Sequence, residues 1–201
     1  MRTRRQRKCI VYRAYRGSAT YSVWALIAAN TLLFIAVLAH RDIIYTFGLQ
    51  PSDWLERPWI LLTSLFIHSN LWHIAANMIS LYFFGRFLSM LTGEKIFLVI
   101  YFLGGIAGSL VYVLLASPYS IAIGASGAVF AIAGALAVMR PKLRVYIFPI
   151  PAPVPLWAAV VGGFVVISIL PYVAWQAHLG GLVLGLTAGY FLRKRQRIII
   201  F

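Results

Sequence analysis

Long runs of apolar residues alternate with short polar segments along the whole chain. The runs cover about residues 19–39, 71–91, 96–115, 124–139, 155–170 and 175–192. A helix needs roughly 20 apolar residues to cross a bilayer core of about 30 Å, and most of these runs come close to that length. The pattern therefore predicts an all-α polytopic membrane protein with six spans.

The fourth run is short and is built largely from glycine and alanine. At about 1.5 Å per residue, residues 124–139 would form a helix of roughly 24 Å, which falls short of the bilayer core. We therefore expect the chain to enter the membrane region as a loop and to begin this helix near Ser126. Because small side chains let neighbouring helices pack closely, we expect the fourth helix to be the central one.

Composition supports a membrane protein and argues against a nucleic-acid partner. Hydrophobic residues make up 62% of the 201 residues and charged residues 11%, whereas soluble domains carry roughly one quarter charged residues. The net charge of +14 comes from short basic clusters between the apolar runs, not from a basic face of a soluble fold. The expected partner is the lipid bilayer. The single cysteine, Cys9, excludes a disulfide framework and a cysteine-rich metal site.

The distribution of basic residues predicts the topology. With the N-terminus inside, sixteen of the eighteen lysines and arginines fall in cytoplasmic segments and only Arg41 and Arg57 lie outside, as the positive-inside rule requires. We expect a multi-pass cell-membrane protein with both termini cytoplasmic. Its predicted parts are a basic cytoplasmic tail (1–18), a six-helix domain (19–192) with an interfacial loop (40–70), and a cytoplasmic tail (193–201).

Few strongly polar residues stand inside the predicted spans, and each calls for a functional hypothesis because polar groups are costly in a membrane. Ser126 lies in the sequence Gly-Ala-Ser-Gly at the start of the fourth run. His73 and Asn77 are four residues apart and so share one face of the second helix. His178 precedes a stripe of glycines along the sixth helix, which would let a partner backbone approach closely.

The predicted topology indicates that these polar residues lie close together. The second, fourth and sixth spans all run from outside to inside, and each carries its polar group in its first turns, so these groups should share one depth in the outer half of the bilayer. If the glycine stripe packs on the fourth helix, His178 meets Ser126, and a neutral imidazole can activate a serine alcohol near pH 7. No acid is placed to join them, so the pattern favours a Ser/His dyad over a triad. Donors for an oxyanion would come from His73, Asn77 and the backbone N–H of Ser126.

Three motifs carry a resemblance to a known family. They are Gly-x-Ser-Gly at 124–127, His-x4-His-x3-Asn at 68–77, and Ala-His followed by Gly-x3-Gly at 177–185. Each motif alone is weak evidence. Their conjunction, order and spacing resemble those of rhomboid intramembrane serine proteases over roughly residues 59–193.

The resemblance implies a six-transmembrane-helix rhomboid bundle with a short central fourth helix. It implies a serine endopeptidase that cleaves single-span membrane proteins near the outer membrane face, with Ser126 as nucleophile and His178 as general base. It also makes His73 and Asn77 oxyanion-hole donors and requires neither a metal nor another cofactor. The motif glycines are Gly124, Gly127, Gly181 and Gly185.

Two positions depart from the family pattern. Many rhomboids have Trp-Arg in the first loop, where this chain has Trp59-Ile60. Many carry a tyrosine four residues after the serine, where this chain has Phe130. Phenylalanine keeps the stacking on the histidine that the resemblance implies and loses only a hydroxyl, so the departures bear more on anchoring of the loop than on catalysis.

Other interpretations of the polar residues remain open at this point. Gly-Ala-Ser-Gly taken alone is also a helix-packing sequence, and His68 is expected to be a structural hydrogen-bonding residue. A zinc protease site would need His-Glu-x-x-His, which is absent. A transporter or proton channel would use histidines as relays, but the predicted inner half holds no paired ionisable group. A non-catalytic rhomboid-like protein that binds transmembrane clients is the main alternative, and the oligomeric state stays open.

Peptide hydrolysis consumes water, so a protease needs a polar hollow open to the outside, walled by the second, fourth and sixth helices. Substrate would enter from the lipid beside the fifth span. Gly162, Gly163 and Pro171 make that span the least rigid wall.

Overall fold

The computed structural model describes residues 20–146 and 151–193. Nearly all of the two predicted cytoplasmic tails, including Cys9, lies outside these ranges. The helices are α1 (Tyr21–Ala39), α2 (Ile43–Phe47), α3 (Ile60–Thr63), α4 (Leu71–Ser80), α5 (Arg86–Thr92), α6 (Glu94–Leu115), α7 (Ser126–Met139), α8 (Leu156–Ser168) and α9 (Trp175–Leu192).

Shorter elements complete the fold. A 3-10 turn, η1 (Ser64–Phe66), follows α3, and a π-helical turn, η2 (Leu81–Gly85), joins α4 to α5. Two short antiparallel strands, β1 (Arg144–Val145) and β2 (Val154–Pro155), lie between α7 and α8. The apolar pattern did not predict this ladder.

Local signals explain where the main helices begin. The side chain of Asn70 accepts a hydrogen bond from the backbone N–H of His73 and so caps α4. Gly93, with φ of 86°, separates α5 from α6, and Pro155 stands immediately before α8. The long helices begin and end within two residues of the apolar runs in the sequence.

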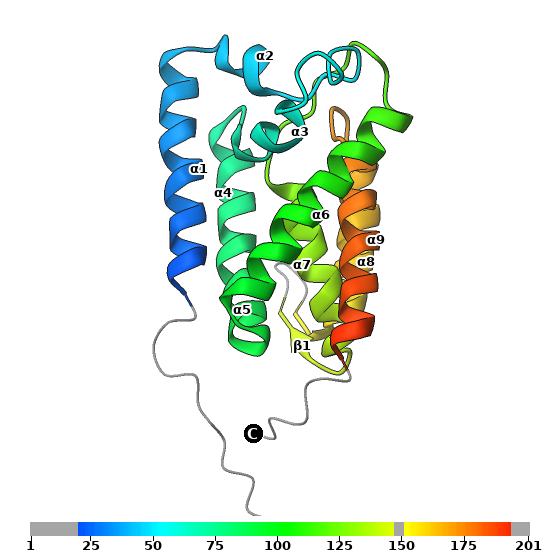
Figure 1. Ribbon diagram of the computed structural model, residues 1–201. Helices are drawn as coiled ribbons and strands as arrows, with labels where there is room; N and C mark the ends of the chain where they lie inside the picture. The colour runs from blue at the N-terminus through cyan, green and yellow to red at the C-terminus, as the bar shows by residue number, and fades with distance from the viewer. Residues whose placement is uncertain (1–19, 147–150, 194–201) are drawn as a thin grey trace, which may run out of the picture.

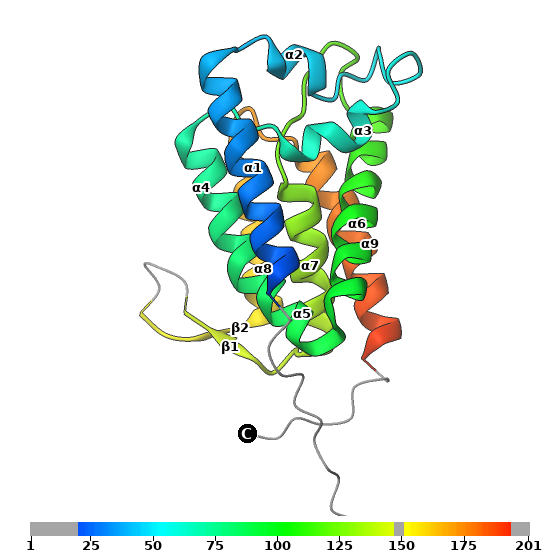
Figure 2. The same ribbon diagram turned by 60° about the vertical axis from the view of Figure 1, so that its left-hand side comes forward.

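Helix α7 lies at the centre of the bundle and packs against α4, α6, α8 and α9. Figure 2 shows it between α4 and α8 on one side and α6 and α9 on the other. Most of its side chains are buried, and most of these are small. The expectation of a short central helix in residues 124–139 thus matches a helix that begins at Ser126.

Glycines on α9 allow the backbone of this helix to pack directly against the backbone of α7. A Cβ atom added at Gly181 would lie 1.9 Å from the carbonyl oxygen of Gly127, and one at Gly185 would lie 2.0 Å from the carbonyl oxygen of Ala131. One turn further along, a Cβ at Gly189 would lie 2.5 Å from the carbonyl oxygen of Ala135. A side chain at any of these positions would force the two helices apart.

By length and apolar composition, three helical segments of the described chain could cross a membrane: Tyr21–Ala39, Leu71–Thr92 and Glu94–Leu115. Helices α7 and α8 are apolar but shorter. The protein is therefore a mostly helical membrane protein, in agreement with the coarse expectation from the sequence.

The predicted interfacial loop, residues 40–70, contains α2, α3 and η1 and folds over one end of the bundle (Figure 1). Ser109 of α6 donates a hydrogen bond of 2.8 Å to the carbonyl of Leu61. Leu49 and Ala122 exchange two backbone hydrogen bonds of 2.9 Å. Ile60, which stands where many rhomboids have arginine, is fully buried. Apolar burial and backbone contacts thus anchor this loop.

An ion pair between Asp53 and Arg57 adds a second anchor within the loop. Arg57 also donates to the carbonyl of Tyr45, at 3.3 Å. Hydrogen bonds from the Ser52 hydroxyl and the Arg57 guanidinium hold the pKa of Asp53 below its ordinary value. Any stabilisation from this pair is therefore present at neutral pH and is lost only as the pH falls through the lowered pKa.

Candidate active site

Ser126 is the first residue of α7, and the loop before it is tightly held. Gly124 has φ of 115°, a conformation that favours glycine, and its N–H donates to the carbonyl of Ser64 at 2.8 Å. The first N–H groups of a helix have no partner inside the helix. The backbone N–H of Ser126 is one of these groups and stands beside the serine hydroxyl.

His178, in the first turn of α9, contacts Ser126 directly. Its Nε2 lies 2.7 Å from the serine Oγ. Its Nδ1 is buried and has no hydrogen-bond partner among the described residues, so no carboxylate orients the ring. The contact has the geometry of a serine and its general base, without the third member of a triad.

The ring of His73 reaches the serine loop from α4. A Cβ atom added at Gly124 would lie 2.6 Å from the Nε2 of His73, so glycine is what allows this approach. Asn77 is buried one turn further along α4, and its Nδ2 donates to the carbonyl of His73 at 2.8 Å. An amide nitrogen carries two hydrogens, so one donor of Asn77 remains for another acceptor.

Phe130 lies one turn below Ser126 and covers the imidazole of His178. The two ring centroids are 4.8 Å apart, with 34° between the planes. On its other side Phe130 meets Phe164 of α8 edge to face, at 5.9 Å. The ring therefore links the histidine to the helix that the sequence indicates as the entrance for substrate.

His68 is fully buried, and neither ring nitrogen has a hydrogen-bond partner in the described part of the chain. Its ring meets that of His73 edge to face at a centroid distance of 5.0 Å. The hydrogen-bonding role expected for His68 stays a prediction. Its role in the structure is to pack against His73.

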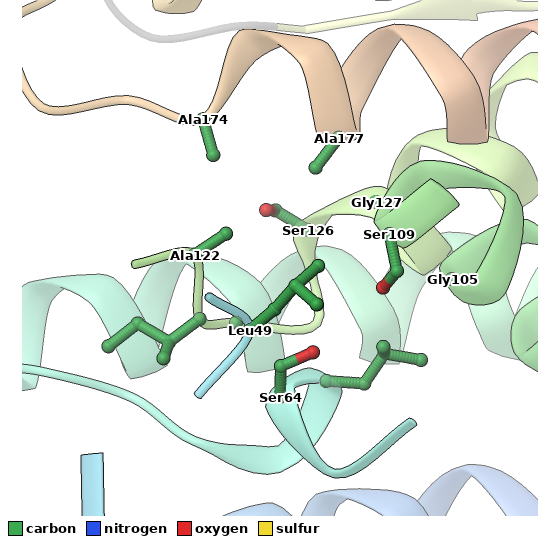
Figure 3. Close-up of a pocket in the computed structure, with 12 residues that line it drawn as sticks. Leu49, Ser64, Gly105, Ser109, Ala122, Ser126, Gly127, Ala174 and Ala177 are labelled. Carbon is green, nitrogen blue, oxygen red and sulfur yellow. The ribbon is translucent and has the colours of Figure 1, made fainter. Parts of the chain in front are cut away.

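A small cavity of about 20 Å³ lies behind Ser126, which is room for about one water molecule. Figure 3 shows Ser126 between the Ala174–Ala177 segment and two further serines, Ser64 and Ser109, whose hydroxyls point into the space between them. Nothing in the sequence marks Ser64 as a residue of this site, because only the fold of the first loop brings it there.

A much larger open cavity, of about 1470 Å³, lies on the other side of the serine. Residues of α4, α7 and α8, the loop before α7 and the loop between α8 and α9 line it. It brings together five residues that the sequence analysis selected: His73, Asn77, Ser126, Phe130 and His178.

Within the described residues there is no cluster of three or more histidine, cysteine, aspartate or glutamate side chains that could hold a metal ion. The chemistry available at the site is therefore that of an alcohol, two imidazoles, an amide and backbone N–H groups. This donor set fits acyl transfer through a serine.

Comparison with known proteins identifies the family. Residues 55–195 match the Rhomboid domain. The chain is 28% identical to Rhomboid protein 1, mitochondrial, of Saccharomyces cerevisiae over 193 residues, 86% of this chain and 53% of that protein. It is 32% identical to RHOMBOID-like protein 12, mitochondrial, of Arabidopsis thaliana over 197 residues, 86% of this chain and 58% of that protein.

A bacterial relative is also similar. Rhomboid protease GluP of Bacillus subtilis is 31% identical over 138 residues, 65% of this chain and 27% of that protein. The chain thus spans little more than half the length of the mitochondrial relatives above and about a quarter of the bacterial one. The match to the Rhomboid domain covers well over half of the chain and confirms the resemblance that its motifs indicate: the chain belongs to the rhomboid family.

Proposed function

We propose that this protein is an intramembrane serine endopeptidase that cleaves single-span membrane proteins near the outer membrane face. The observation that carries the proposal is the 2.7 Å contact between Ser126 and His178, at the edge of a large open cavity. The bacterial relative named above is a rhomboid protease, which is consistent with this activity.

In the proposed reaction the Oγ of Ser126 attacks the scissile carbonyl carbon while His178 Nε2 takes the hydroxyl proton. The developing oxyanion would accept hydrogen bonds from the backbone N–H of Ser126, from His73 Nε2 and from the free amide hydrogen of Asn77. Collapse of this intermediate breaks the peptide bond, and His178 returns the proton to the leaving amine. Water then attacks the acyl-enzyme, gives its proton to His178 and releases the new carboxylate and the free serine.

Phe130 would support this cycle by keeping the imidazole of His178 in place. The ring contact restricts rotation of the histidine, which has no hydrogen bond at Nδ1 to orient it. Stacking would thus perform part of the positioning that a carboxylate performs in a triad.

We propose that α1, the α4–α5 segment, α6, α7, α8 and α9 all cross the membrane, with the end that carries the β1–β2 ladder in the cytoplasm. The positive-inside rule supports this orientation, because the basic residues between α7 and α8 and at the end of α9 lie at that end. The loop of residues 40–70 would then lie at the outer surface, and the site would open toward outside water. Cell-membrane location remains our expectation, although two of the relatives named above are called mitochondrial.

Substrate would reach the cavity between α4 and α8. Both helices line it, and no side chain stands within 4 Å of a Cβ added at Gly162 or Gly163, so this part of α8 packs loosely. A transmembrane helix entering here would have to unwind locally, because its scissile carbonyls are otherwise held in its own hydrogen bonds.

The proposal is tested by incubating the purified protein with a single-span membrane protein in detergent or vesicles and mapping new termini by mass spectrometry. We expect one cut near the outer end of the span, absent from Ser126→Ala. Binding of the substrate without any cut would instead identify a non-catalytic member of the family that binds transmembrane clients.

A further inference from the structure

Ser69, in the loop immediately before α4, contacts the ring of His73 on the side away from Ser126. Its Oγ lies 3.3 Å from the Nδ1 of His73. The backbone carbonyl of Ser69 accepts a hydrogen bond of 2.8 Å from Arg41, in the turn between α1 and α2. Arg41 therefore holds the backbone of Ser69, and the hydroxyl of Ser69 faces the ring of His73.

The neighbouring Asn70 donates a hydrogen bond to the Ser69 hydroxyl. Its Oδ1 accepts from the backbone N–H of His73 at 2.9 Å, and a backbone N–H can only donate. This contact fixes which end of the amide is oxygen and which is nitrogen. The Nδ2 of Asn70 is then the group that lies 3.1 Å from the Oγ of Ser69, and it donates to that oxygen.

The Oγ of Ser69 accepts from Asn70, and among the described residues the Nδ1 of His73 is the one acceptor that its own hydrogen can reach. A neutral imidazole that accepts at Nδ1 carries its proton on Nε2. That Nε2 is the atom that faces Gly124 and the serine loop. These hydrogen bonds from Asn70 to Ser69 and from Ser69 to His73 thus leave an N–H donor on the Nε2 of His73. This donor, and not a lone pair, faces the place where an oxyanion would form.

Within the described part of the chain, no other group forms a hydrogen bond with the Nδ1 of His73. The adjacent His68 meets His73 by an edge-to-face ring contact and not by a hydrogen bond. Asn77 contacts the backbone carbonyl of His73 and not its ring. Ser69 and Asn70 are therefore the polar side chains whose contacts can set the protonation pattern of this ring.

We propose that Ser69 is a positioning residue that fixes His73 in the tautomer protonated at Nε2 by donating its hydroxyl hydrogen to Nδ1, while Asn70 donates to the same hydroxyl oxygen. The catalytic consequence rests on the proposed function, because only a protease needs this donor for an oxyanion. The tautomer itself does not depend on catalysis and can be measured in an inactive protein.

The first test uses 15N-labelled Ser126→Ala protein and reads the two ring nitrogens of His73 by NMR. The chain contains four histidines, so the His73 signals can be assigned by replacing His40, His68 and His178 in turn. We expect His73 to be protonated at Nε2. In Ser69→Ala the two tautomers should mix, whereas Ser69→Thr keeps the hydroxyl and should keep the pattern. Ser52→Ala, which removes a hydroxyl from the outer loop away from the ring, is the matched control.

The second test measures cleavage with Ser126 intact. We expect Ser69→Ala to lower kcat roughly tenfold with little change in KM, less than the roughly 10²–10³-fold loss from removing an oxyanion donor. Ser69→Thr should restore kcat. An unchanged His73 tautomer in Ser69→Ala would overturn the proposal whatever the activity. The expected tautomer shift in a protein that cleaves nothing would support Ser69 as a positioning residue and refute the proposed protease function.

Discussion

The Oγ of Ser126 and the Nε2 of His178 lie 2.7 Å apart although 52 residues separate them in the sequence. Backbone packing of α9 on α7 makes this contact, since Gly181 and Gly185 let the two helices meet without intervening side chains. The dyad therefore depends on the glycine stripe as much as on its two reacting groups.

Replacing Gly181 by alanine should separate the two helices. The added Cβ would lie 1.9 Å from the carbonyl oxygen of Gly127, and a backbone atom cannot move away as a side-chain end can. We expect a loss of about 1–3 kcal/mol in stability or more. Activity should fall by roughly 100-fold, because displacements near 1 Å have effects of that size. Thermal unfolding and substrate cleavage measure the two effects.

The matched control is Val183→Ile, which adds one carbon at an exposed position of the same helix, α9. It should leave both stability and activity near those of the unchanged protein. Full activity in Gly181→Ala would contradict the close packing of α9 on α7.

Shortening Phe130 should weaken catalysis without abolishing it. Phe130→Ala removes the ring contacts with His178 and Phe164, and such contacts contribute about 0.5–1.5 kcal/mol each. We expect kcat to fall by roughly 2- to 10-fold per lost contact. Phe130→Tyr keeps the stacking and should stay near full activity. If the alanine variant were as fast as the tyrosine variant, stacking would have no part in positioning His178.

A covalent crosslink between α4 and α8 should block substrate entry and leave the Ser126–His178 dyad unchanged. Cysteines at Ala76 and Ile167, both of which line the large cavity, can be linked with a bifunctional thiol reagent in a protein whose Cys9 is replaced by serine. We expect the linked protein to lose cleavage of a single-span substrate but to keep labelling of Ser126 by a small fluorophosphonate. Unchanged cleavage after complete linking would place the entrance elsewhere.

Helix-breaking residues near the cleavage point of a substrate should speed its turnover. A helical segment keeps its carbonyls in internal hydrogen bonds, so it must unwind before Ser126 can attack. Exchanging glycine or proline near the cut for leucine should slow cleavage by the intact protein. An equal rate for the two substrates would argue against local unwinding.

The lengths of the apolar runs predicted the long helices, because a run of about 20 apolar residues is typical of a helix that crosses a membrane. The short fourth helix and its start near Ser126 were both expected because the apolar run of residues 124–139 is too short for a bilayer core, whereas the φ of 115° at Gly124 is known only from the structure. The β1–β2 ladder and the π-helical turn at Leu81–Gly85 left no comparable signal, since each depends on a few local hydrogen bonds.

Residues of the candidate site could be predicted where their residue type is rare in the surrounding sequence. They could not be predicted where that type is common. Ser126, His73 and His178 attracted attention because polar groups are scarce in the apolar runs. Ser69 and Asn70 stand in a polar loop, where serine and asparagine are ordinary, and their contacts with His73 depend on how that loop turns into α4. Of these two residues, only Asn70 could have been identified from the sequence, because asparagine is a common helix-capping residue and stands three positions before His73.

The most direct test of the Ser126–His178 dyad is labelling by a fluorophosphonate, which reacts with an activated serine. The purified protein in detergent should label at one site, identified by mass spectrometry as Ser126. Labelling should vanish in Ser126→Ala and fall sharply in His178→Ala, and it should be unchanged in Ser117→Ala, which alters an exposed serine of the α6–α7 loop. Equal labelling of all these forms would contradict the account, because the serine would then react without its histidine or would not be the reacting residue.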